Sequence, residues 1–201
     1  MNKMSLKKGR INQKIKTRTS ILNAAKHLMS KSTSITMEEV AQKAKVSRAT
    51  MYRYFPNLEL LYTEASLDVH HLSPDLLMEK VAHMPLRERI FFIQSYYNKL
   101  AQDHELIFRR YLSAVLKASI ISKKKIRGAR RVAAMQLILD AYKNDLSSNN
   151  LKNLKNIASI LMGMEPLIVA KDVCDLSNEE ANETLHWGLE MILKGMEIES
   201  K

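Results

Sequence analysis

The sequence predicts an all-α protein. Its 201 residues include only five glycines and four prolines, a composition that favours helix over sheet. Apolar residues recur at helical spacing along the chain, and no strand-like alternation or internal repeat interrupts them. A hydrophobic fraction of 46% over this length is enough for a buried core in one or two domains.

Net positive charge is confined to the start of the chain. Residues 1–57 hold 13 Lys or Arg against two acids, Glu38 and Glu39, while residues 58–201 have equal numbers of basic and acidic side chains. A basic head attracts polyanions, because each neutralised phosphate releases counterions. We therefore expect a DNA-binding domain at 1–57 and a second helical domain at 58–201.

The basic head divides into an arm and three helices. Residues 1–16 lack the apolar stretch of a secretory signal, and we expect a disordered arm that touches the DNA backbone. A helix follows over about 17–30, where Ile21, Ala24, Ala25 and Leu28 share one face. The run from Thr36 to Glu39 is a capping box, which predicts the start of a short second helix.

The third helix begins at a second cap. Ser47 is a favourable N-cap, and Pro56 disfavours a helical Phe55, so the helix should end near Tyr54. Asn57 then caps a fourth helix to about Leu72.

The remaining helices are marked by prolines and caps. Pro74 and Pro85 each suit a first helical turn. Ser177 and Glu180 form a second capping box before the last helix. Helices are predicted over about 86–102, 104–120, 128–146, 151–171 and 178–197.

Residues 36 to 54 have the composition of a helix–turn–helix. Ala41 supplies the small residue that the crossing of the two helices needs, and Val46 supplies the apolar plug of the turn. On the second helix we expect Ala49, Phe55 and part of Tyr52 to pack inward. Ser47, Arg48, Thr50 and Tyr54 would then face outward, as a recognition helix requires for the major groove.

The stretch "TSILNAAKHLM…TMEEVAQKAKVSRATMYRYFPNLELLYTEA" resembles the DNA-binding head of TetR-family (TetR/AcrR-like) transcriptional regulators over about residues 17–65. The resemblance implies base-contacting or groove-lining roles for Arg48, Thr50 and Tyr52, and Arg48 can pair bidentately with guanine. It also implies phosphate contacts for Thr36, Tyr54, Lys14, Lys16 and Arg18. For Lys43, Lys45 and Arg53, phosphate contact and solvated charge remain equally good interpretations.

The resemblance further implies a ligand-binding and dimerisation domain after the head. We expect a pocket for an unknown small-molecule effector among the middle helices, although for any single candidate residue a plain core role is the better interpretation. The candidates are Phe91, Phe92, Tyr96, Phe108, Tyr111, Met135 and Met162. Apolar stripes lie on the last two predicted helices, and a monomer could bury them internally. The resemblance implies instead that two copies pack them into a four-helix bundle, which makes a twofold homodimer. The expected interface residues are Leu154, Ile157, Ala158, Leu161, Leu185, Gly188, Leu189, Ile192 and Met196.

These observations favour a transcriptional repressor over other classes. Glu183 and His186 form half of a di-iron helix motif, but the sequence has no second copy of it. We therefore expect no metal site, no cofactor and no enzymatic activity. A single cysteine and the lack of a membrane-length apolar run fit a cytoplasmic, nucleoid-associated protein without a membrane partner. The alternative is a ligand-independent structural or partner-recruiting DNA-binding protein with the same fold.

Overall fold

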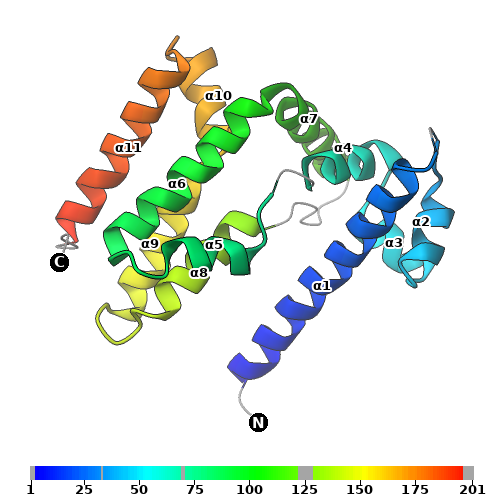
Figure 1. The fold of residues 1–201 in the computed structure, drawn as a ribbon, viewed down its shortest axis with the longest axis horizontal. Coiled ribbons are helices and arrows are strands. Elements are labelled where there is room, and N and C mark those ends of the chain that lie inside the picture. Colours follow the sequence, from blue (N-terminus) through cyan, green and yellow to red (C-terminus); the bar gives the residue numbers. More distant parts are fainter. Residues whose placement is uncertain (1–2, 33, 69–70, 122–128, 197–201) are drawn as a thin grey trace. The chain divides into compact units, whose positions relative to one another are not determined.

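The computed structural model describes residues 3–32, 34–68, 71–121 and 129–196, and it confirms the all-α prediction. All regular elements in these ranges are helices, and none is long and apolar enough to cross a membrane. They are α1 (Lys3–Met29), α2 (Met37–Lys43), α3 (Arg48–Tyr54), α4 (Leu58–Asp68), α5 (Pro74–Val81), α6 (Leu86–Asp103), α7 (Glu105–Ile121), α8 (Arg130–Asp140), α9 (Ser148–Ile160), α10 (Met164–Asp172) and α11 (Asn178–Gly195), labelled in Figure 1.

The chain divides into two compact units. The first contains residues 1–70 and 106–128, and the second contains residues 71–105 and 129–201. This division differs from the expected boundary after Asn57, because α4 and nearly all of α7 group with the head. The return of α7 is a long-range contact that local sequence patterns do not indicate.

The first unit is built around one apolar core. Ile21 and Ala25 of α1, Val40 of α2 and Met51 of α3 are fully buried in it, and α4 and α7 add further side chains. The α1 helix begins at Lys3 and runs well past α2 and α3 (Figure 1), whereas we expected a disordered arm before residue 17. The arm prediction was therefore wrong about backbone conformation.

In the second unit, α6 packs against α5, α8, α9, α10 and α11. Its apolar side chains Ile90 and Ile93 are fully buried, and so are Met135 of α8 and Leu189 of α11. Ser73 caps α5 with Pro74 in the first turn, and the Ser177–Glu180 capping box opens α11, both as predicted.

The segment predicted as one helix over 151–171 is two helices, α9 and α10. Gly163 interrupts them with a left-handed backbone (φ +82°), and its N–H donates to Asn98 Oδ1 at 2.8 Å. Gln94 Nε2 donates to the carbonyl of Leu161 at 3.0 Å, and Arg131 donates to the carbonyl of Met162. Side chains from α6 and α8 thus satisfy the backbone groups that the interruption releases.

Candidate nucleic-acid interface

The helix–turn–helix has the predicted local construction. Thr36 and Glu39 make both bonds of the capping box at the start of α2. The hydroxyl and the N–H of Thr36 both donate to the Glu39 carboxylate, and these two bonds lower the pKa of Glu39. Ser47 Oγ accepts from the Thr50 N–H at 3.1 Å and so caps α3. Between the helices, the Val46 N–H donates to the Ala41 carbonyl at 3.0 Å, which closes the turn.

Two fully buried side chains anchor the recognition helix α3. Met51 and Phe55 lie one helical turn apart and point into the core of the first unit. Ala49 precedes Met51 by two residues, about 200° around the helix, and is exposed. The expectation that Ala49 packs inward is therefore corrected. Tyr54, expected to face outward, is half-buried against the same core.

The opposite face of α3 is open to solvent. Arg48 has 75% of its side chain exposed, and Tyr52 is 39% exposed. Arg48 Nε lies 3.3 Å from Glu38 Oε1 of α2, and its Cζ lies 5.6 Å from the centroid of the Tyr52 ring. Such a surface ion pair is weak, so the guanidinium is oriented but remains available for a base edge.

Other predicted contact residues differ in exposure. Lys14, Lys16, Thr36, Lys45 and Ser47 are exposed, and Thr50 is half-buried with its hydroxyl accepting from Ser47 Oγ at 3.0 Å. Arg18 lies inside the unit, where Nε donates to Glu64 Oε1 at 2.6 Å. The structure therefore gives Arg18 an internal partner in place of the expected phosphate contact.

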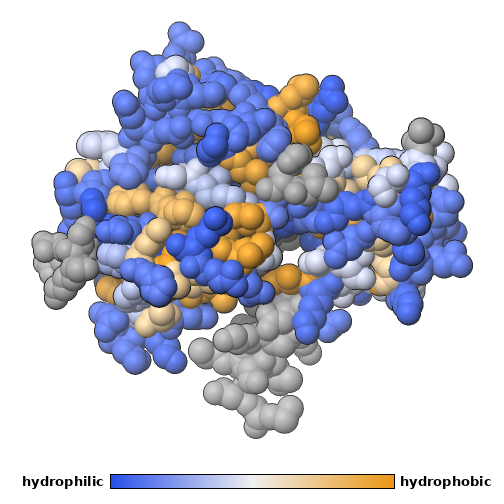
Figure 2. Space-filling view, viewed as in Figure 1, coloured by the Kyte–Doolittle hydropathy of each residue, from blue (hydrophilic) through white to orange (hydrophobic). Residues whose placement is uncertain are grey.

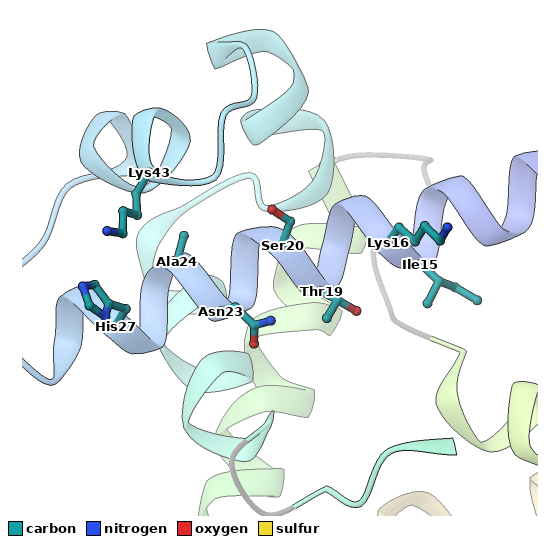
Figure 3. Close-up of a pocket in the computed structure, with 8 residues that line it drawn as sticks. All are labelled: Ile15, Lys16, Thr19, Ser20, Asn23, Ala24, His27 and Lys43. Carbon is teal, nitrogen blue, oxygen red and sulfur yellow. The ribbon is translucent and has the colours of Figure 1, made fainter. Parts of the chain in front are cut away.

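An open hollow of about 630 Å³ lies between α1 and the end of α2. Figure 3 shows Lys16, Thr19, Asn23 and His27 along successive turns of α1, and Lys43 extending from α2. The positive charges of Lys31 and Lys43 lower the pKa of His27. A basic hollow lined by hydroxyl and amide groups suits phosphate oxygens. The face of the molecule seen in Figure 2 is largely hydrophilic.

The residues predicted for an effector pocket fall into both units. Phe108 packs against the core of the first unit, and the Tyr111 hydroxyl donates to Glu64 there. In the second unit, Met135 and Met162 are fully buried. Phe91 stacks on His186 with ring centroids 4.0 Å apart, and the Tyr96 hydroxyl accepts from the Leu72 N–H at 2.7 Å. Phe92 is half-buried.

The residues predicted for the dimer interface are largely covered by their own chain. Leu154, Ala158, Leu185 and Leu189 are buried within the second unit. Ile157, Leu161, Gly188, Ile192 and Met196 are half-buried. Other apolar side chains of this unit, which were not among the predicted interface residues, are exposed. Trp187 (64% exposed) and Met191 (39%) are two of them, and they lie one turn apart on α11.

Comparison with known proteins gives two positive results. Residues 21–65 match the family described as bacterial regulatory proteins, tetR family. The fold is similar to the crystal structure of a TetR transcriptional regulator from Rhodococcus sp. RHA1, with a TM-score of 0.53 and 16% sequence identity over 90% of this chain and 97% of that one. A search of curated protein sequences found no match.

The exposed recognition helix, its buried anchors and its capped turn define a helix–turn–helix DNA-binding protein. The family match covers this same motif, and the similar fold extends over the rest of the chain. Residues 21–65 therefore match the helix–turn–helix segment of bacterial regulatory proteins of the tetR family, as the sequence resemblance predicted.

Proposed function

We propose that the protein is a repressor that binds a near-palindromic operator as a homodimer and is released by a small molecule. The observation that carries the proposal is the two-sided recognition helix, with Met51 and Phe55 buried and Arg48 and Tyr52 exposed. A helix held from behind can insert its N-terminal half into the major groove, where Arg48 reads guanine.

Phosphate contacts would come from the basic side chains around this helix. Lys16 and Lys43 border the hollow beside α2, and Lys45 is exposed in the turn. They would set the register of the head on the duplex without reading sequence. Thr36, also expected to contact phosphate, is exposed at the start of α2, where its N–H and hydroxyl already donate to the Glu39 carboxylate at 2.7 and 2.8 Å.

Dimerisation is supported by the exposed apolar face of α11. Trp187 and Met191 are costly to leave in water and are typical of an interface. Two copies related by a twofold axis would carry two recognition helices about 34–36 Å apart, one turn of DNA.

The effector would release the protein from DNA by shifting the balance between two conformations of the protein. A ligand bound by the second unit must favour a conformation whose heads no longer match successive grooves. Moving the balance from 1:99 to 99:1 needs roughly 5.5 kcal/mol of differential affinity. Phe91 and Tyr96, both half-buried on α6, are the side chains of this unit that we propose to contact such a ligand.

The proposal is tested by selecting genomic fragments with the purified full-length protein at physiological salt. Arg48→Ala is run in parallel, with Lys99→Ala on α6 of the second unit as the matched control for loss of an exposed charge. We expect one or a few near-palindromic sites, lost with Arg48→Ala and kept with Lys99→Ala. Scattered, salt-sensitive binding that ignores Arg48 would instead support a structural DNA-binding protein.

A further inference from the structure

A buried ionic cluster joins three helices of the first unit. The Glu64 carboxylate of α4 is 5% exposed and receives two hydrogen bonds from the guanidinium of Arg18 on α1, the first from Nε at 2.6 Å. The Tyr111 hydroxyl of α7 donates to the same carboxylate at 3.0 Å. One carboxylate thereby holds α1, α4 and α7 together.

Burial of this cluster has a cost that plain core packing would avoid. Replacing a buried ion pair by apolar residues is often neutral or stabilising, whereas removing one partner is strongly destabilising. Burial lowers the pKa of Arg18, but bonds and charge from Glu64 and Tyr111 outweigh it and the pKa is raised. Arg18 therefore stays charged, and its planar fork demands one orientation.

That orientation reaches the end of the recognition helix. The Cζ atom of Arg18 lies 4.6 Å from the centroid of the Phe55 ring, within range of a cation–π contact. Phe55 is fully buried and is the C-cap of α3, where its N–H donates to the Met51 carbonyl at 2.9 Å. A continuous series of contacts thus runs from Tyr111 through Glu64 and Arg18 to the end of α3.

We propose that Glu64 is a positioning residue for DNA recognition. It holds Arg18 against Phe55, and through Tyr111 it couples the orientation of α3 to the position of α7. This inference rests on the proposed DNA-binding function. The chain enters α7 directly from residues 71–105 of the second unit and re-enters that unit after residue 128. A displacement of α7 would therefore be passed to the recognition helix through this carboxylate.

The test compares sequence-specific with non-specific DNA affinity, since a merely structural defect lowers both by the same factor. The specific probe is the duplex that the wild-type full-length protein enriches from a random pool, and the non-specific probe is that duplex with its half-sites scrambled. Variants are Glu64→Gln and Tyr111→Phe. The matched control is Asp68→Asn, because Asp68 bonds Lys26 Nζ at 2.6 Å and also joins α4 to α1.

We expect Glu64→Gln to lower the ratio of the two affinities about tenfold or more, and Tyr111→Phe to lower it about threefold or more, as the loss of bonds to a charged group implies. The double variant should be no worse than Glu64→Gln alone, because both act through one carboxylate. Asp68→Asn should leave the ratio within about twofold, because the bond that it removes joins α4 to Lys26 and not to Arg18.

Two results would overturn the inference. One is a ratio of specific to non-specific affinity that Tyr111→Phe leaves unchanged. This variant alone tests the inference if circular dichroism shows that Glu64→Gln does not fold. The other is an equal loss of the ratio in Asp68→Asn. If the wild-type protein enriches no duplex at all, it does not bind DNA sequence-specifically. That result rejects the proposed function, and the proposed role of Glu64 is rejected with it.

Discussion

At the scale of single residues, the same side-chain type has opposite roles in this head. Arg48 is exposed beside Tyr52, whereas Arg18 is enclosed between Glu64 and Phe55. The surroundings of the ion pair explain the difference. Arg48 pairs with Glu38 at the solvent-exposed surface, where such a pair is weak, whereas Arg18 pairs with Glu64 in the core. We therefore propose that Arg48 reads a base and that Arg18 supports the helix that presents it.

The basic hollow predicts a specific salt dependence. Because each neutralised phosphate contributes about −0.9 to the slope of log K against log salt, Lys16→Gln with Lys43→Gln should make the slope shallower by about 1–2. The fall in affinity should be similar on all sequences. The measurement is a binding isotherm at several salt concentrations, and Lys152→Gln on α9, also exposed, should leave the slope unchanged. An unchanged slope in the double variant would remove the hollow from the interface.

Sequence patterns predicted much of the local structure of the helix–turn–helix, and the failures have physical reasons. Caps and turn residues act on neighbours in the chain, so Thr36, Ser47 and Val46 were placed correctly. The fate of Arg18 depends on Glu64, 46 residues away. A signal did exist, because Glu64 lies among apolar positions of α4 and a charge there needs a buried partner.

At the scale of elements, α11 depends on its N-terminal capping box. Ser177→Ala should cost about 1 kcal/mol in the free energy of unfolding at neutral pH.

The same capping box predicts a pH dependence. Hydrogen bonds from the backbone and side chain of Ser177 lower the pKa of Glu180. The stabilisation from the ionised Glu180 is therefore present above its unfolded-state pKa, and it is lost as pH falls through the depressed folded-state pKa. Urea titrations from neutral to acid pH should show a flatter profile for Glu180→Ala. Glu179→Ala, an exposed neighbour, should keep the wild-type profile.

The break between α9 and α10 predicts opposite effects at two glycines. Gly163→Ala should destabilise by about 1–2 kcal/mol, because φ is +82° and an added Cβ would lie 2.7 Å from an Arg131 nitrogen. Gly188→Ala, inside α11 with nothing near the added Cβ, should stabilise by about 0.5–1 kcal/mol. Chemical denaturation of each purified variant measures both. A stabilising Gly163→Ala would contradict the account of the break.

The presence of a helix could be predicted from the sequence more readily than the residues at which the helix begins and ends. Pro74 and the two capping boxes are local signals, and the structure confirms them. The break at Gly163 depends on Asn98, Gln94 and Arg131, which are distant in sequence, so periodicity alone predicted one continuous helix. The helical start of α1 was missed because charge and low hydrophobicity are shared by disordered arms and exposed helices.

At the scale of the whole molecule, the dimer proposal makes a prediction about mass. Trp187→Glu places a charge on the exposed apolar face of α11 and should shift the protein from dimer to monomer in sedimentation equilibrium at micromolar concentration. Leu76→Glu, at another exposed apolar site, on α5 (47% exposed against 64% for Trp187), should remain a dimer. Operator affinity should fall steeply in the Trp187 variant, because two half-sites are no longer bound together. A wild-type protein that sediments as a monomer would contradict the proposal.

We propose that Arg48, on an α3 anchored by the buried Met51 and Phe55, reads a base. The affinities of wild-type and Arg48→Ala protein for every single-base variant of the selected duplex test this role. Arg48→Ala should lose about 1–3 kcal/mol of discrimination at one guanine per half-site, symmetrically placed, and little elsewhere. A uniform loss at all positions, with the base preferences unchanged, would mean that Arg48 contacts phosphate and does not read a base.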